Sequence, residues 1–324
     1  MKHKKGGQVP MRSVCGICAA GMLCLGPALN AQTQSPASAA VNVSIPVLVE
    51  LNSGEVDFGL SATDFSLKDN GIEQQFHLDK KAEAKPVALV LVVQTGRDAM
   101  KGLSQIAELS DTLDSFLAKP GSQIAILTFD GSPHLVQEFT SDPELIRNTL
   151  GSISKGNSHA ALFDAVDLAI GYFRRAPVGD QKEIFLISGE HDHGSVEYGM
   201  TSVLHAANSS DVSIDSFTFR SGGVELFGRL HTINPLNMAT SSMEKNTVAT
   251  LAELTGGEFF RFRGEADLQN CADRAASHLR SRYILTFEPS SPQPGFHSLQ
   301  VAVLAPGAKI ASARDSYWIS QEAP

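Results

Sequence analysis

The chain has 324 residues, of which 42% are hydrophobic and 19% charged, a composition typical of globular proteins and not of disordered or fibrous ones. Its 26 basic residues are outnumbered by 35 acidic ones, which gives a net charge of −9. Because there is no basic excess to neutralise phosphates, we exclude a nucleic-acid partner. A chain of this length can bury a hydrophobic core without help from a metal or a disulfide.

Residues 1–31 have the pattern of a secretory signal peptide. Four basic residues precede or flank a short apolar run, Val14 to Leu25, and a small residue, Ala31, ends the segment. Both Met1 and Met11 are compatible starts. The apolar run is too short to span a bilayer, which needs about 20 residues. We therefore expect a secreted or periplasmic protein, cleaved near Ala31, that meets the membrane only during export. Cleavage leaves 22 basic against 35 acidic residues, a net charge of −13.

After a polar linker over 32–40, the first elements are β-strands. Hydrophobic residues at every second position predict a half-buried strand over 41–51. Shorter strands are predicted over 65–67 and 72–78, joined by a turn at Asn70-Gly71.

The middle of the chain alternates between continuous apolar runs and helical spacing. The apolar runs predict strands over 87–93, 124–129, 135–139, 183–187, 212–219 and 258–262. Helices are predicted over 100–117, 142–150, 160–173, 196–208, 247–254 and 265–281. Such alternation favours an open, mainly parallel sheet with helices on both faces. We assign 85–283 to this α/β domain.

The chain ends in β-strands again, predicted over 283–287, 296–303 and 310–319. The β segments at the two ends are each too small to bury a sheet face alone. We therefore expect 41–80 and 284–319 to pair into one small β-sandwich, into which the α/β domain is inserted.

Short motifs stand near both ends of the chain. They are Gly59-Leu60, Asp64-Phe65 and Asp69-Asn70-Gly71 near the start, and Arg282-Tyr283-Ile-Leu and Ala313-Arg314-Asp-Ser-Tyr317-Trp318 near the end. Together with the α/β segment between them, they resemble exported von Willebrand factor A (VWA)-related proteins of the acidobacterial type. The resemblance implies a Rossmann-like VWA domain with a metal-ion-dependent adhesion site (MIDAS). In that family the site lies at the C-terminal ends of the parallel strands, where oxygen ligands hold Mg²⁺.

The sequence departs from the MIDAS pattern at each ligand position. The residues that stand there are Gln94, Gly96 and Asp98 in the first loop, Ala160 in the second and Gly189 in the third. Arg97 adds a positive charge beside the site, which disfavours a bound dication. The resemblance therefore implies a degenerate MIDAS, and we expect no Mg²⁺ or other cofactor.

Polar side chains near these positions leave a second interpretation open. They are His159, Asp164, Glu190, His191, Asp192 and His193. Imidazole and carboxylate together can hold Zn²⁺ or another divalent metal, with His191, Asp192 and His193 as the candidate ligands. No fixed metal-ligand spacing is present, and solvated residues on an exposed loop are the simpler explanation. For Asp164 we expect a role in bracing a helix start or a loop.

We do not predict an enzyme. The chain has no Gly-x-Ser-x-Gly motif and no complete glycine motif for phosphate or dinucleotide binding. Cys271 has the helical spacing of a core residue and not the setting of a nucleophile, so an uncharacterised hydrolase ranks third. We predict instead a protein-binding, adhesion or scaffold module. Its binding surface is the rim formed by 94–101, 157–164, 189–196 and 220–246, the last a long segment without periodicity.

Overall fold

The computed structural model describes residues 42–57, 59–79, 85–96, 106–176, 181–219 and 246–319. All of them belong to one compact unit of the chain, Ala39–Pro324. The predicted signal peptide, the linker, Arg97, Asp98 and the segment 220–245 lie outside the described residues. Within those ranges, no helix combines the length and the apolar character that crossing a bilayer requires.

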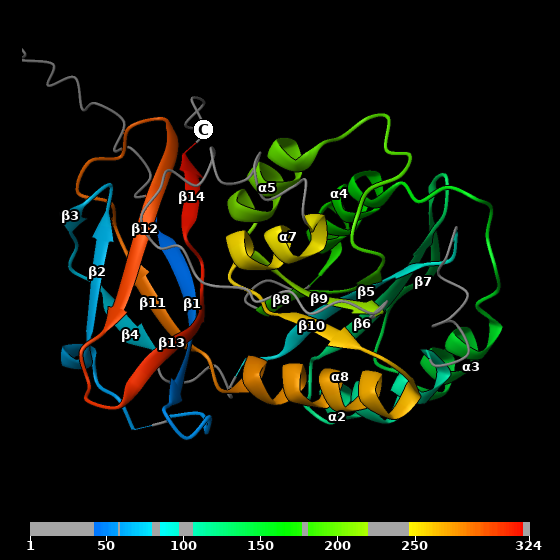
Figure 1. Ribbon diagram of the computed structural model, residues 1–324, viewed down its shortest axis with the longest axis horizontal. Coiled ribbons are helices and arrows are strands. Elements are labelled where there is room, and N and C mark those ends of the chain that lie inside the picture. The colour runs from blue at the N-terminus through cyan, green and yellow to red at the C-terminus, as the bar shows by residue number, and fades with distance from the viewer. Residues whose placement is uncertain are drawn as a thin grey trace, which may run out of the picture. The chain divides into compact units, whose positions relative to one another are not determined.

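A six-stranded sheet forms the centre of the α/β part, in the order β10-β9-β8-β5-β6-β7 (Figure 1). The strands are β5 (Val87–Gln94), β6 (Gln123–Phe129), β7 (Pro133–Thr140), β8 (Gln181–Ser188), β9 (Val212–Phe219) and β10 (Phe259–Phe262). Neighbouring strands are parallel, except that β7 is antiparallel to β6. The predicted, mainly parallel sheet is confirmed. The strand order reverses at β5, which has β6 on one side and β8 on the other.

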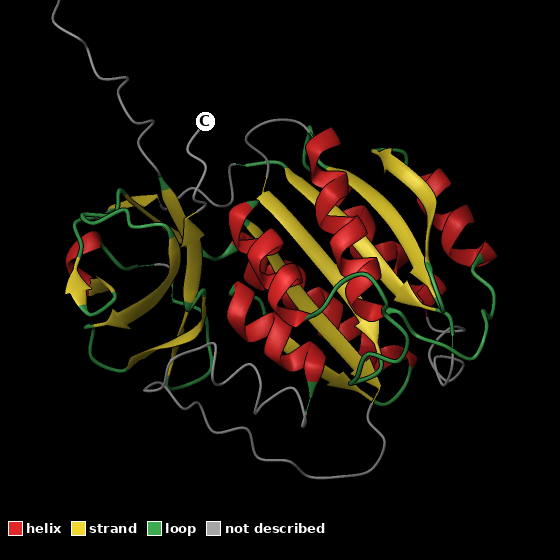
Figure 2. Ribbon diagram, turned by 90° about the horizontal axis from the view of Figure 1, so that it is seen from above, coloured by secondary structure: helices red, strands yellow, loops and turns green. Residues whose placement is uncertain are grey.

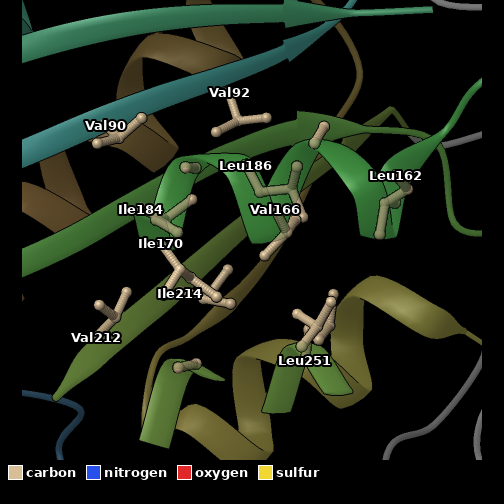
Figure 3. Close-up of a cluster of buried hydrophobic side chains, with 14 of the residues drawn as sticks. Val90, Val92, Leu162, Val166, Ile170, Ile184, Leu186, Val212, Ile214 and Leu251 are labelled. Atoms are coloured by element: carbon tan, nitrogen blue, oxygen red, sulfur yellow. The ribbon is translucent and has the colours of Figure 1, made fainter. Parts of the chain in front are cut away.

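Helices cover both faces of this sheet (Figures 1 and 2). One layer contains α4 (Leu162–Tyr172), α5 (Met200–Ser209) and α7 (Thr247–Thr255), and the other contains η4 (Ile106–Leu109), α2 (Ser110–Leu117), α3 (Pro143–Ser152) and α8 (Glu265–Arg280). A short 3-10 helix, η5 (Phe173–Arg175), follows α4. Alternate residues of β5 pack against the two helix layers. Val90 and Val92 lie in the same core as α4 (Figure 3), whereas Leu89 and Leu91 belong to the opposite core. Burial on both faces explains why β5 is apolar throughout.

Two four-stranded antiparallel sheets are built from the ends of the chain, in the orders β13-β1-β11-β4 and β14-β12-β2-β3. Their strands are β1 (Val43–Leu51), β2 (Phe65–Asp69), β3 (Ile72–Glu73), β4 (His77–Asp79), β11 (Tyr283–Phe287), β12 (Gly295–Val303), β13 (Ala308–Ala313) and β14 (Ser316–Ile319), with η1 (Ala62–Asp64) before β2. Ile45 and Leu285 of the first sheet share one core with Leu67 and Leu299 of the second. The predicted architecture, an α/β part with a mainly parallel sheet set into a small β-sandwich, is confirmed.

Two of the predicted strands were wrong because each is divided between the two sheets. The segment 72–78 forms β3, which pairs with β2, and then β4, which pairs with β11. The segment 310–319 likewise contains the last residues of β13, which pairs with β1, and then β14, which pairs with β12. Apolar residues on both sides of the second crossing, Ile310 and Ala313 before it and Tyr317 and Ile319 after it, pack on the same core. The sequence pattern therefore does not reveal the change of sheet.

A group of charged residues is buried inside the α/β part. Arg282, Glu183 of β8 and Asp215 of β9 are each no more than 2% exposed. The Arg282 guanidinium donates to Glu183 Oε2 and to Asp215 Oδ1, both at 3.0 Å. Burial raises the pKa of Asp215 to about 6, against the opposing effect of the Arg282 charge, and raises the pKa of Glu183 well above its ordinary value. Buried charges of this kind are tolerated because they are paired.

Candidate binding rim

The predicted site residues gather at the C-terminal edge of the six-stranded sheet. Gln94 ends β5 and Ser188 ends β8, and the loops that follow these two strands meet the loops after β6 and before α4. The strand order reverses at β5. In open α/β sheets, this reversal is where the loops diverge and where ligands bind.

Gln94 links two of these loops directly. Its side chain is buried, and its Oε1 accepts a hydrogen bond from Gly189 N at 2.8 Å. Its Nε2 donates to Gly96 O at 3.1 Å. An ionised carboxylate at this position has no hydrogen to donate to Gly96 O. The amide therefore links the loops after β5 and β8.

Gly96 lies against the backbone of the loop 156–159. A Cβ added at Gly96 would lie 2.0 Å from His159 O and 2.9 Å from Asn157 O. Thr95 fixes the same region, because Thr95 N donates to Phe129 O at 2.7 Å and Thr95 O accepts from Gly156 N at 3.0 Å. The space beside Gly96, where the MIDAS pattern has a serine, is filled by protein backbone.

Asp130, which follows β6, is a rim residue that the sequence analysis missed. Its Oδ2 accepts from Asn157 N at 3.0 Å, its Oδ1 accepts from Ser132 N at 3.2 Å, and its carboxylate lies 3.5 Å from the His134 ring. Burial raises the pKa of Asp130, but these partners together outweigh burial and leave the pKa below its ordinary value. The signal that could have found it is an acidic residue directly after the buried strand predicted over 124–129.

Asp192 caps the N-terminus of α4. Its Oδ1 accepts from Leu162 N at 2.8 Å and from the Ser195 hydroxyl, and its Oδ2 accepts from Ser195 N at 3.3 Å. The chain beside it is held by a two-way backbone pair between Ala160 and His193, at 2.9 and 2.8 Å. A carboxylate at the start of a helix satisfies free N–H groups and interacts favourably with the helix dipole. Both Asp192 oxygens are therefore engaged in the fold.

Asp164, in the first turn of α4, braces the loop before α5. Its carboxylate accepts from the backbone N–H groups of Val196, Glu197 and Tyr198, at 3.0, 3.2 and 3.0 Å. The bracing role that we expected for Asp164 is what these bonds provide. The helix predicted from 196 begins only at Met200, after this braced stretch.

The other candidate residues are dispersed along the rim. Glu190 pairs with Arg261 of β10 at 3.2 Å. The rings of His191 and His193 lie 6.2 Å apart between centroids, and His159 is exposed on the neighbouring loop. Among the residues that the structure describes, no three His, Cys, Asp or Glu side chains are grouped as a metal site would require.

Cys271 lies on α8, where it packs against the core between α8 and the sheet. Burial raises the pKa of its thiol to about 11, so the thiol is protonated at neutral pH. This setting agrees with the core position expected from the helical spacing.

Residues 92–191 match the family model of the von Willebrand factor type A domain. No curated protein matches the chain. Among solved structures, a von Willebrand factor type A protein from Catenulispora acidiphila is 9% identical, over 88% of this chain and 76% of that one, with a TM-score of 0.46.

Two further structures have similar scores. The vWF domain of the type V pili tip protein Mfa5 from Porphyromonas gingivalis is 13% identical, over 60% of this chain and 94% of that one, with a TM-score of 0.43. Proximal thread matrix protein 1 from the mussel byssus, with a zinc-occupied MIDAS motif, is 12% identical, over 66% of this chain and 49% of that one, with a TM-score of 0.46. The family match over 92–191, together with the order and direction of the strands around it, shows that the α/β part of this chain has the von Willebrand factor type A fold.

Proposed function

We propose that this chain is an exported, non-enzymatic protein-binding or scaffold module, related to the VWA proteins of the acidobacterial type, whose MIDAS is degenerate. The binding surface is the rim at the C-terminal edge of the six-stranded sheet, and a protein partner binds there without Mg²⁺. Export follows from the signal-peptide pattern of 1–31. VWA domains commonly mediate protein–protein interaction, which is the family property that this proposal carries over.

The packing around Gly96 carries the metal-free part of the proposal. A serine hydroxyl at Gly96 would need the space that His159 O occupies. The residues present do not fit Mg²⁺, which takes six oxygen ligands in near-ideal octahedral geometry. Ala160 and Gly189 offer no side-chain oxygen. The Gln94 amide already bridges the two loops that a metal ion would otherwise connect.

Two further groups that could serve as ligands are engaged elsewhere. Asp192 caps α4 through Oδ1 and accepts from Ser195 N through Oδ2, and Asp130 accepts from Asn157 N and Ser132 N. A metal at either carboxylate would have to replace hydrogen bonds that hold the loops in place. The second candidate function is a Zn²⁺-dependent binder. Its candidate ligands are then His191 and His193, whose rings are neighbours.

Isothermal titration calorimetry of the exported protein with Mg²⁺, Mn²⁺ and Zn²⁺ separates these functions. The proposal expects no heat of binding for Mg²⁺ or Mn²⁺. Saturable Mg²⁺ binding refutes it. Zn²⁺ binding that is lost in both His191→Ala and His193→Ala favours the second function, and turnover on a panel of esters and phosphoesters favours a hydrolase.

A further inference from the structure

Val196 is the most exposed large hydrophobic side chain in the described part of the chain. Its exposed fraction is 88%, and Tyr198, two residues further on, is 39% exposed. Both lie on the loop 194–199, the second part of the connection from β8 to α5 at the rim. A single exposed apolar residue is ordinary on a protein surface. Val196 differs from such residues in how its backbone is held and in the charges around it.

The backbone that presents Val196 is held by two carboxylates. Asp164 accepts from three consecutive N–H groups, beginning with Val196 N at 3.0 Å, and Asp192 accepts from Gly194 N and Ser195 N at 3.4 and 3.3 Å. Asp164 itself is only 9% exposed and is fixed in the first turn of α4. Val196 therefore projects from an ordered loop. A partner that covers it loses little conformational entropy from this side of the interface.

Negative charge surrounds the exposed side chains. The charge of Asp167, on α4, is the largest influence that raises the pKa of Tyr198, and partial burial and the charge of Glu197 act in the same direction. Glu197 is exposed, next to Val196 in sequence. Asp164 adds a third negative charge that acts on Tyr198, and Arg174 opposes the charge of Asp167. A complementary surface carries positive charge.

We infer that the loop 194–199 is the anchor of the binding rim, and that it fits a polypeptide partner with apolar side chains flanked by Lys or Arg. The partner places its apolar side chains over Val196 and its cations beside Glu197 and Asp167. This inference rests on the proposed function, namely that the rim binds protein. The same carboxylates repel nucleic acid and anionic lipid. An apolar centre with a polar rim is the usual anatomy of a protein interface, and Tyr198 beside Val196 is of a residue type enriched in interface hot spots.

A displayed library of random peptides, with acidic and basic residues at equal frequency, tests the inference. The exported protein is immobilised, peptides are selected on it, and their dissociation constants are measured for the wild type, Val196→Ser and Val136→Ser. Val136, on β7, is 44% exposed and serves as a matched control outside the loop. Both valines are exposed, so neither variant should change folding.

We expect the enriched peptides to combine apolar residues with net positive charge and to bind more weakly as salt is raised. Val196→Ser should weaken their binding by about tenfold or more, whereas Val136→Ser should leave it unchanged. Glu197→Gln should weaken binding less than Val196→Ser does. Peptides that bind Val196→Ser as tightly as wild type, or that are acidic, overturn the inference. If His159→Ala abolishes the binding of those peptides, the rim still binds protein and the proposed function stands. A library that yields no binder overturns the proposed function as well.

Discussion

Replacing Gly96 by alanine tests whether the loop 156–159 fills the position beside β5. The added Cβ would lie 2.0 Å from His159 O, whereas nonbonded heavy atoms prefer a separation of about 3.5 Å. The carbonyl belongs to the backbone and has no alternative rotamer. The loop must therefore retreat by about 1.5 Å to relieve the overlap.

Such a retreat separates the loop from its partners. Gly156 N donates to Thr95 O, and Asn157 N donates to Asp130 Oδ2, each at 3.0 Å. Losing these two bonds costs about 0.5–1.5 kcal/mol each, and overpacking a close contact costs about 1–3 kcal/mol. We therefore expect the free energy of unfolding of Gly96→Ala to fall by about 3 kcal/mol.

Urea unfolding followed by circular dichroism measures this loss, with Gly189→Ala as the matched control. A Cβ at Gly189 would lie 3.5 Å from Gln94 Oε1, which is an ordinary contact, so the control should change stability by less than about 0.5 kcal/mol. If Gly96→Ala unfolds at the same urea concentration as the wild type, the loop does not occupy this space. The metal-free interpretation of the rim then loses its main support.

Three other variants test separate parts of the structure. Gln94→Leu removes both side-chain hydrogen bonds of the buried amide and leaves Gly189 N without its acceptor. The free energy of unfolding in urea should therefore fall by about 1–3 kcal/mol. A variant as stable as wild type contradicts the bridging role. Gly171→Ala, in α4 with no atom within 4 Å of the added Cβ, should stabilise the protein by about 0.5–1 kcal/mol, and a lower Tm would count against this helix assignment. Asp215→Asn tests the pH dependence of stability. Burial raises the pKa of Asp215 to about 6, so between about pH 4 and pH 6 the folded state keeps a proton that the unfolded chain has released. The free energy of unfolding of the wild type should therefore fall as pH rises through this range. The Asn variant should show a flatter stability profile over that range, and an unchanged slope would show that Asp215 is not the group responsible.

The arrangement of the candidate site followed from sequence only in part. Gln94 and Gly189 could be placed at one edge of the sheet, because each follows a buried parallel strand. That the Gln94 amide joins the two loops depends on the distance between them, which no local pattern specifies. The same holds for Asp192. Its neighbours in sequence suggested a metal ligand, yet its carboxylate accepts from the start of α4, thirty residues away along the chain.

The fold class of this protein is determined by periodicity in the sequence. Continuous apolar runs can be buried only between two helical layers, and strict alternation only in sheets with one buried face, so the α/β part and the β-sandwich follow from local pattern. The tertiary structure decided where a strand changes sheet, which side chains cap α4, and that backbone fills the space beside Gly96. These features depend on contacts between segments distant in sequence, whose spacing is set by packing and by hydrogen bonding of otherwise unsatisfied backbone groups.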